Sequence, residues 1–233
     1  MNQSFKGDDI AIRARNVTLS LGSSDAPTAI LRGIDLEITT GSSVAILGPS
    51  GSGKSSLMAI LSGLERASGG SVAVAGVDFT ALDEDGLARA RRGRIGIVLQ
   101  AFHLLPTMTA LENVAVPLEL SGAQDAFDRA ARELEAVGLG HRTHHYPAQL
   151  SGGEQQRVAI ARAVAPAPAI LFADEPTGNL DEATSADIVA LLFARQRAAG
   201  ATLVMITHDP ALAKRCDRII RMGDGLIAED SGR

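Results

Sequence analysis

A run of glycine, serine and lysine residues between positions 48 and 55 carries the clearest chemical signal in the sequence. The segment Gly48-Pro-Ser-Gly-Ser-Gly-Lys-Ser55 fits the phosphate-loop pattern G-x-x-x-x-G-K-[ST]. Its glycines let backbone N–H groups turn toward phosphate oxygens, and a helix beginning near Ser55 points its positive end at them. In this pattern Lys54 neutralises the β- and γ-phosphates, and the Ser55 hydroxyl binds Mg²⁺. The nucleotide contacts that we expect are Gly48, Pro49, Ser50, Gly51, Ser52, Gly53, Lys54, Ser55 and Ser56.

The simpler interpretation of this segment is a glycine turn without a ligand. The flanking sequence argues against it, because the apolar run Val44–Leu47 precedes the segment and a helical stretch from about 55 to 64 follows. Strand, glycine-rich turn and helix form the context that a phosphate loop requires. The sequence therefore predicts a site for ATP and Mg²⁺.

Two adjacent carboxylates, Asp174 and Glu175, follow the apolar run Ile170–Ala173. Neighbouring acids are often only surface residues. Here a buried strand would present them at its carboxyl end, where open α/β sheets bind their ligands. We therefore expect Asp174 to hold Mg²⁺ through water and Glu175 to act as the general base for the attacking water.

A second anion-ready segment, Leu150-Ser-Gly-Gly-Glu-Gln-Gln156, lies far along the chain from Lys54. Ser151 and Glu154 have the spacing of a capping box, which predicts a helix start. A well-capped helix with no further role is one explanation. Gly152 and Gly153 weaken it, because glycine disfavours helix while bare backbone suits the close approach of an anion.

The elements that must position these residues alternate between apolar runs and helical stretches. Apolar alternation predicts strands between residues 10 and 38, with a slip between Ile12 and Val17. Further strands are predicted at 44–47, 72–76, 95–99, 170–173 and 203–206, a helix at about 183–199, and a hairpin at 218–229. Between about 101 and 167 the chain reads as helical, and one helix carries Phe127, Ala130, Ala131, Leu134 and Val137 at helical spacing before Gly138. Unbroken apolar strands separated by helices indicate a parallel sheet covered on both faces.

Composition excludes several classes of function. The formal charge of −5 and the 3% aromatic residues provide neither a positive field nor stacking platforms, so we expect no nucleic-acid partner. The basic run of Arg89, Arg91, Arg92 and Arg94 is then interpreted as a solvated face. A single cysteine, Cys216, fits a reducing compartment. The longest apolar run, Ile188–Ala194, is too short to span a bilayer, so any membrane role must come from a partner.

From about residue 10 to 230, these motifs resemble the nucleotide-binding subunit of the ATP-binding-cassette (ABC) family. The segment LSGGEQQ is similar to that family's signature, and Gln100, the loop Gly178–Asp181 and His208 match further family motifs. Taken alone, Gln100 and His208 would be ordinary loop residues. The resemblance implies that Gln100 ligates Mg²⁺ and senses a permease, and that His208 contacts the γ-phosphate. It also implies that the loop ending at Asp181 couples the two sites of a dimer.

The resemblance further implies a fold and an assembly. The expected fold is a single α/β domain over residues 1–233, a P-loop NTPase of ABC type. It would have a RecA-like parallel-sheet core, an antiparallel β subdomain and a helical subdomain inserted at about 101–167. Two copies would form a homodimer that sandwiches two ATP molecules. Each phosphate loop would then face Ser151, Gly152 and Gly153 of the other copy.

Finer resemblances concern the branch of the family. Ala173–Asp181 and Leu105–Val114 resemble the branch of lipoprotein-release, macrolide-export and cell-division ATPases, and Pro147–Gln156 is most similar to its uncharacterised exporter ATPases. This implies an ATP hydrolase that powers a separate integral membrane permease and exports or extracts an apolar, lipid-like substrate. Such a subunit would be cytoplasmic and peripheral on the inner face of the cell membrane through that permease.

Two alternatives to transport stay open. One is a mechanotransmitting ATPase that regulates a membrane or periplasmic machine without moving a substrate. The other is a soluble ABC ATPase outside transport, which predicts coiled-coil insertions, zinc cysteines or tandem cassettes, and the sequence contains none of these.

Two local features complete the expectations. Leu21 aligns with the position where the family usually stacks adenine on an aromatic residue, so we expect weak discrimination between ATP and GTP. The segment Phe102–Leu120 carries more apolar side chains than a short surface loop needs, including Leu105 and Met108. It is interpreted either as core of the helical insert or as a groove for a short cytoplasmic helix of the permease.

Overall fold

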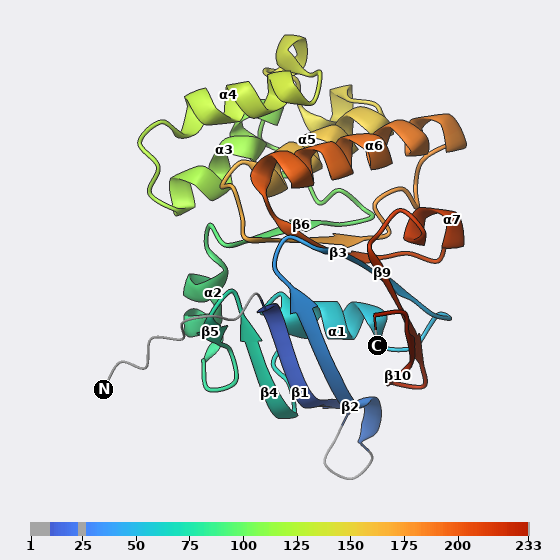
Figure 1. Cartoon of the computed structure of the whole chain (residues 1–233). Helices are drawn as coiled ribbons and strands as arrows, with labels where there is room; N and C mark the ends of the chain where they lie inside the picture. The colour runs from blue at the N-terminus through green and yellow to red at the C-terminus, as the bar shows by residue number, and fades with distance from the viewer. Residues whose placement is uncertain (1–9, 23–26, 233) are drawn as a thin grey trace.

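Figure 1 shows the computed structural model of the chain, which describes residues 10–22 and 27–232. The strands are β1 (Ile10–Leu21), β2 (Thr28–Thr39), β3 (Ser43–Leu47), β4 (Gly69–Val74), β5 (Val77–Asp78), β6 (Ile95–Val98), β7 (Ile170–Asp174), β8 (Thr202–Ile206), β9 (Arg218–Gly223) and β10 (Leu226–Asp230). The helices are α1 (Lys54–Leu61), α2 (Glu84–Arg91), α3 (Ala110–Leu120), α4 (Ala126–Ala136), α5 (Gly152–Val164), α6 (Glu182–Ala199) and α7 (Pro210–Ala213), with 3₁₀ turns η1 (Gly140–Arg142) and η2 (Pro147–Gln149).

The larger sheet has the strand order β10-β9-β3-β8-β7-β6. Its strands from β9 to β6 pair in parallel, and β10 closes the edge as the antiparallel arm of the predicted C-terminal hairpin. Alternate residues of β7 pack in different core clusters, because Phe172 faces α1 while Leu171 faces α5 and α6. The sheet is therefore covered on both faces, as its unbroken apolar strands predict.

The smaller sheet is antiparallel, with the strand order β2-β1-β4-β5. The slip predicted in β1 is confirmed as a register shift between Ala14 and Val17, where Asn16 has a φ of 46°. This extra residue turns Val17 and Leu19 to the side already occupied by Ile12, so all three are buried.

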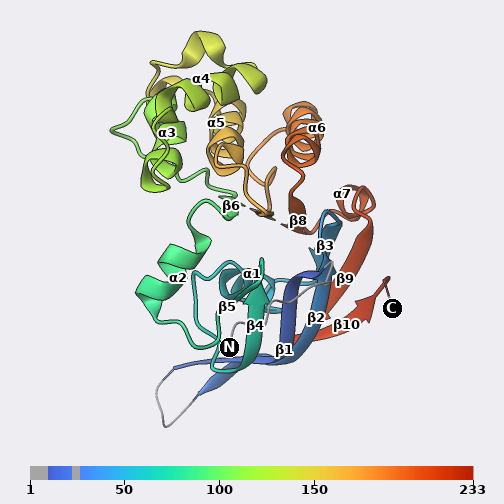
Figure 2. The same ribbon diagram turned by 60° about the vertical axis from the view of Figure 1, so that its left-hand side comes forward.

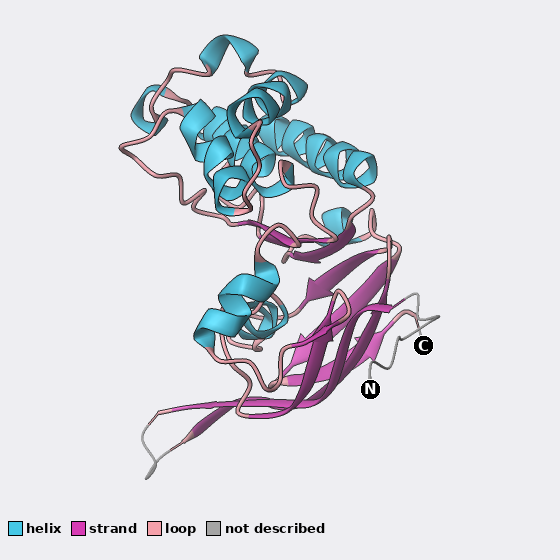
Figure 3. Cartoon of the chain, turned by 90° about the vertical axis from the view of Figure 1, so that its left-hand side faces the viewer, coloured by secondary structure: helices cyan, strands magenta, loops and turns pink. Residues whose placement is uncertain are grey.

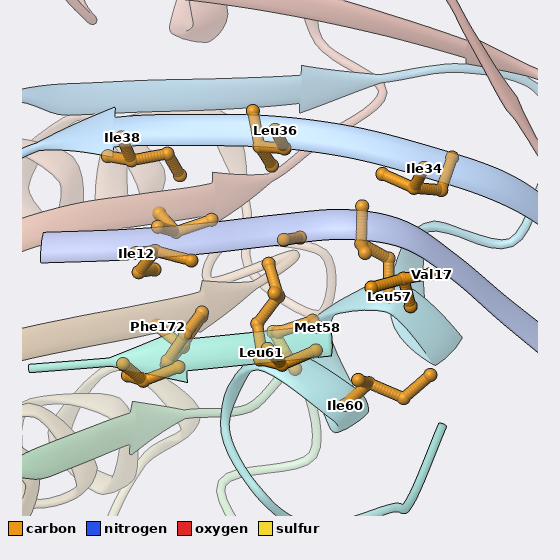
Figure 4. Close-up of a cluster of buried hydrophobic side chains, with 14 of the residues drawn as sticks. Ile12, Val17, Ile34, Leu36, Ile38, Leu57, Met58, Ile60, Leu61 and Phe172 are labelled. Atoms are coloured by element: carbon orange, nitrogen blue, oxygen red, sulfur yellow. The ribbon is translucent and has the colours of Figure 1, made fainter. Parts of the chain in front are cut away.

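Helix α1 lies between the two sheets and joins their cores (Figure 4). Its residues Leu57, Met58, Ile60 and Leu61 are at most 3% exposed. They belong to the same apolar cluster as Ile34, Leu36 and Ile38 of β2 and Phe172 of β7. The helix that follows the glycine-rich loop is thus held by both sheets.

The helices α3, α4 and α5 form a separate layer, visible at one end of the molecule in Figures 2 and 3. They share a core cluster that includes Val114, Leu118, Leu134 and Val158. Gly138 follows α4 with a φ of 79°, as its predicted place after the helix requires. Phe127 does not join this core: it is 46% exposed, and Ala126 takes the inward position instead.

Helix α2 is an element that the sequence analysis did not predict. Asp83 caps it by accepting a 2.7 Å hydrogen bond from the backbone N–H of Gly86. Arg89, Arg92 and Arg94 are exposed, as expected of a solvated face. Arg91 is an exception, because it is partly buried and donates a 2.6 Å hydrogen bond to the carbonyl of Gly63. Across the described part of the chain, none of the helices has the length and apolar character needed to cross a membrane.

Candidate functional site

The candidate residues meet at the carboxyl edge of the larger sheet. Four strands lie next to one another there in the order β3-β8-β7-β6, all parallel. Predicted site residues lie at the carboxyl end of each strand. The phosphate loop follows β3, His208 follows β8, Asp174 and Glu175 end and follow β7, and Gln100 follows β6. Residues far apart in the sequence therefore converge because their strands are neighbours.

An open cleft of about 520 Å³ lies at this edge. Its lining comprises Ile30, Gly48, Ser50, Gly51, Gly53, Lys54, Ser55, Ser56, Gln100, Asp174, Glu175, Ile206 and His208. Pro49 and Ser52 belong to the same loop without lining the cleft, and Ser52 is only 3% exposed. Ile30 and Ile206 were not predicted as site residues, since an aliphatic side chain in a strand gives no chemical signal.

The loop between β3 and α1 has a shape that only particular residues allow. Gly48 has a φ of 156°, and a Cβ atom there would lie 2.3 Å from the carbonyl oxygen of Met222. The Lys54 ammonium lies inside the loop and donates to the carbonyls of Gly48 at 2.9 Å and Pro49 at 2.8 Å. The positive end of α1 and the Lys54 ammonium thus share one loop, which suits a phosphate ligand.

Glu175 and His208 form the closest polar contact in the cleft outside that loop. Nδ1 of His208 lies 2.9 Å from Oε1 of Glu175, and the Glu175 side chain is 19% exposed while the His208 side chain is 77% exposed. Glu175 also has a φ of 44°, and its backbone N–H donates to the carbonyl of Ile206 at 3.0 Å. A non-glycine residue in this region costs about 1–3 kcal/mol and is typically retained where function fixes the side chain.

Asp174, the last residue of β7, lies in a mixed electrostatic environment. Burial raises the pKa of its carboxyl above the ordinary value. A hydrogen bond with Ser55 and the Lys54 ammonium oppose this increase in pKa, whereas the Glu175 carboxylate adds to it. A half-buried carboxylate of this kind gains from a nearby cation.

The donors around Asp174 fit Mg²⁺. The Ser55 hydroxyl contacts Asp174, and Gln100 lines the same cleft, so the available protein donors are oxygens. Within the described residues no group of three or more histidines, cysteines or acids is arranged to hold a metal. Mg²⁺ characteristically takes one or two carboxylates and completes its shell with phosphate oxygens and waters, which matches this sparse donor set.

Gln100 is held by a residue that the sequence analysis did not single out. Its Nε2 donates to Oδ1 of Asn179 at 3.2 Å, and Nδ2 of Asn179 donates back to the Gln100 carbonyl at 3.0 Å. Asn179 lies in the predicted loop Gly178–Asp181, so that loop contacts the Gln100 loop directly. The family-like loop was recognisable in the sequence, but this pairing depends on the tertiary fold.

Another unpredicted contact supports the backbone beyond Glu175. Gln156 on α5 is fully buried, and its Nε2 donates to the carbonyl of Pro176 at 2.6 Å. Its position within the segment Leu150–Gln156 was visible in the sequence, whereas its role in holding the chain after β7 was not.

Ser151, Gly152, Gly153 and Asp181 lie outside the cleft. Ser151 caps α5 through the predicted capping box, accepting from the N–H of Glu154 while Glu154 accepts from the N–H of Ser151. Asp181 caps α6 by accepting from the N–H and the hydroxyl of Thr184. Within one copy of the chain, the N-termini of α1 and α5 therefore do not face the same ligand.

Comparison with protein families places this geometry among known proteins. The sequence profile described as ABC transporter matches residues 31–178. The chain is 47% identical over 222 residues to the "Uncharacterized ABC transporter ATP-binding protein YbbA" of Escherichia coli (strain K12), covering 94% of this chain and 97% of that protein. It is 50% identical over 206 residues to the "Lipoprotein-releasing system ATP-binding protein LolD" of Anaeromyxobacter dehalogenans, covering 87% and 86%.

A relative of different length is the "Macrolide export ATP-binding/permease protein MacB" of Marinobacter nauticus. It is 49% identical over 223 residues, which are 95% of this chain and 34% of that protein. Among solved structures, the dimeric bacterial ABC transporter cassette MJ0796 superposes with a TM-score of 0.86 at 39% identity, over 94% of this chain and 97% of that one. The same cassette in a dimeric post-hydrolysis state bound to ADP and Pi matches with a TM-score of 0.86 at 38% identity.

Proposed function

The chain belongs to the ABC transporter family, as an ATP-hydrolysing subunit of the LolD, MacB and YbbA type, and we propose that it powers a separate integral membrane permease. The observation that carries the proposal is the cleft in which Lys54, Asp174 and Glu175 converge with Gln100 and His208. Such a site binds and hydrolyses a nucleotide. Its polar residues all have a role toward the nucleotide or Mg²⁺, and none is assigned to binding a transported solute. The cargo path is therefore assigned to a partner.

Each residue at the cleft has a proposed role. The phosphate loop and Lys54 bind the β- and γ-phosphates of ATP, while Ser55, Asp174 and Gln100 hold Mg²⁺ directly or through water. Mg²⁺, when bound, neutralises charge that develops on the phosphates. Glu175 takes the proton of the attacking water, and His208, at the end of the neighbouring strand β8, contacts the γ-phosphate. The 2.9 Å contact between His208 and Glu175 supports this division, because it orients the base from a neighbouring strand.

Two copies of the chain form the working unit. The two cassette structures compared above are dimers, which supports a homodimer here. We infer that Ser151, Gly152 and Gly153 complete the site of the other copy, since in one copy they lie away from the cleft. The loop ending at Asp181 would couple the two sites. Its contact with Gln100 through Asn179 supports that role.

The proposed cargo is apolar or lipid-like. Two relatives are named for lipoprotein release and macrolide export, and lipoproteins and macrolides both have large apolar parts. The subunit would lie on the inner face of the cell membrane through its permease, as one domain with its helical insert at about 101–167. Regulation of a membrane machine without cargo is the alternative within the same chemistry.

The test is co-expression with candidate membrane permeases from the same organism, followed by purification in lipid nanodiscs. The complex is expected to hydrolyse ATP and to release a fluorescent lipopeptide from the bilayer only while it does so. If the complex hydrolyses ATP but no lipopeptide leaves, the cargo proposal fails. If the chain and the permease purify separately, the permease proposal fails.

A further inference from the structure

The backbone of Glu175 has a conformation that its local sequence does not favour. Its φ of 44° lies in the left-handed region, and Pro176 follows it. A residue before a proline favours an extended backbone, with φ near about −120°. An unfavourable conformation of this kind persists only where the surrounding structure holds it. The contacts of the chain around Glu175 therefore decide where its carboxylate lies.

Three hydrogen bonds hold the chain at Glu175 and just after it. The backbone N–H of Glu175 donates to the carbonyl of Ile206 at 3.0 Å, which attaches it to β8. The carbonyl of Glu175 accepts from the N–H of Gly178 at 3.0 Å, which closes a turn over residues 175–178. Inside this turn, the carbonyl of Pro176 accepts from Nε2 of Gln156 at 2.6 Å. Gln156 thus ties the turn to helix α5.

Helix α5 is a firm support for this hydrogen bond. It lies between α3 and α4 on one side and α6 on the other (Figure 2). Its residue Ile160 packs in the cluster of β7 and α6, whereas Val158 packs in the cluster of α3 and α4. A Cβ atom at Gly96 of β6 would lie 2.3 Å from the carbonyl oxygen of Ala163, so α5 lies directly on the sheet. The Gln156 side chain therefore begins from a backbone that is fixed on several sides.

The amide of Gln156 contributes little to packing that an apolar side chain could not supply. Gln156 is completely buried, and its Oε1 has no hydrogen-bond partner among the described residues. A buried oxygen without a partner is unfavourable, and an apolar side chain of similar length would fill the same space without it. What the amide adds is the hydrogen bond to Pro176.

We propose that Gln156 is a positioning residue for the general base. Its amide fixes the carbonyl of Pro176 on α5, which prevents the turn from relaxing toward the extended backbone that Pro176 favours for Glu175. The Glu175 carboxylate is thereby kept beside His208 in the cleft. Gln156 itself does not line the cleft. The inference rests on the proposed role of Glu175 as the base and adds the residue through which α5 supports it.

The test removes the amide and keeps the length of the side chain. Gln156→Met has no donor, so we expect the kcat of the full chain to fall about tenfold or more, part of the two to four orders of magnitude that a general base contributes. The Kd for ATP, measured by calorimetry on the same preparation, should change by less than about twofold, because the phosphate loop is untouched. The midpoint of thermal unfolding should change little, since the variant removes the unpaired Oε1 as well as the bond.

Gln196 of α6 provides a matched control. It is also buried in a helix, and its Nε2 also donates to a backbone carbonyl, that of Ala201, away from the cleft. Gln196→Met removes the same kind of bond and should leave kcat unchanged. The inference is overturned if folded Gln156→Met has the kcat of the unmodified chain, or if both methionine variants lose turnover equally. It is also overturned if ATP affinity falls as much as kcat, because the amide would then support binding.

A double-mutant cycle tests whether Gln156 acts through Glu175. In the Glu175→Gln protein, adding Gln156→Met should lower the residual hydrolysis of radiolabelled ATP by less than about twofold, because no carboxylate is left to position. A further loss as large as that in the unmodified chain overturns the inference.

Gln156→Leu is the second variant should Gln156→Met not fold, and it carries the same expectations. If neither variant folds while Gln196→Met does, Gln156 is a structural residue and the inference is overturned. If Glu175→Gln alone hydrolyses ATP at the rate of the unmodified chain, it is the proposed role of Glu175 that fails.

Discussion

His208 and Glu175 meet across the carboxyl ends of two neighbouring parallel strands, with Nδ1 of the histidine 2.9 Å from Oε1 of the glutamate. The contact joins residues that are 33 positions apart in the sequence. Because Glu175 also has a positive φ angle, both its backbone and its side chain are fixed at the cleft. A substitution at Glu175 that keeps the contact with His208 can therefore test the role of the carboxylate alone.

Glu175→Gln should leave ATP binding intact and lower turnover by about two to four orders of magnitude, the range that a general base contributes. Glutamine keeps the length of the side chain and can still bond to His208, so only the basicity is lost. Phosphate release and ATP affinity measured on the same preparation test this. Lys54→Ala is the contrasting variant, since it should weaken ATP binding itself. Wild-type turnover by Glu175→Gln in the assembled complex would remove Glu175 as the base.

Glu175→Gln with Mg-ATP should also trap a dimer, because ATP would remain bound between two copies. Light scattering is expected to show a doubled mass. The matched control adds Ser151→Asp: aspartate is a good helix cap, so α5 should persist, but its charge would oppose the phosphates of the other copy. A dimer that survives this change would count against Ser151 facing the nucleotide.

ATP and GTP should be hydrolysed with similar kcat/KM, within about 1–2 kcal/mol, the worth of one stacking contact. Leu21 is 49% exposed at the end of β1, and no aromatic side chain of the described residues lines the cleft. Leu21→Tyr should therefore raise the preference for ATP. A strong ATP preference that is the same in both proteins would show that another feature selects the base.

Gly178→Ala should slow hydrolysis without unfolding the chain. A Cβ atom at Gly178 would lie 2.7 Å from Nε2 of Gln100, so the glutamine amide must move and its bond to Asn179 must break. We expect a higher Mg²⁺ requirement for turnover, with thermal unfolding close to that of the unmodified protein. Asn179→Ala should shift the Mg²⁺ requirement in the same direction. An unchanged Mg²⁺ titration in both variants would separate Gln100 from the metal.

Cys216 should resist alkylation in the folded protein. Burial, reinforced by the Asp217 carboxylate, raises the pKa of its thiol to about 12. The reactive thiolate is therefore about one part in ten thousand at pH 8, compared with about a quarter for a free cysteine. Iodoacetamide labelling followed by mass measurement should be slow in buffer and rapid in denaturant. Labelling in buffer at the rate of free cysteine would contradict the raised pKa of this half-buried thiol.

The sequence and the structure agree best where one local pattern decides the outcome. β3, β7 and β8 are buried on both faces, so their unbroken apolar runs identify them. Helix α2 was missed because it buries little more than Leu87 and Ala90, which is too small an apolar face to give a helical period. Its cap, Asp83, was the available signal.

In the candidate site, too, the residues that a local pattern marks were predicted, and the contacts that depend on the tertiary fold were not. The spacing from Gly48 to Ser55 and the carboxylates after β7 could be found from residue types alone, whereas Gln100 and His208 needed a family resemblance. The contacts of Arg162 with Phe102 and His103 span about sixty residues and join backbone carbonyls, which carry no sequence signal. The strand order that gathers the cleft is likewise a property of the whole sheet.

Helix α1 is wedged between the two sheets while its first turn faces the nucleotide cleft. Leu57 and Leu61 of this helix are completely buried. Heat or denaturant therefore cannot disorder the phosphate loop without also unfolding the main core. The packing of α1 thus contributes both to the free energy of unfolding and to ATP affinity. Substitutions at Leu57 should lower both quantities. The helices α3 and α4 pack in a different cluster, so substitutions at Leu118 or Leu134 should lower stability with little effect on nucleotide binding.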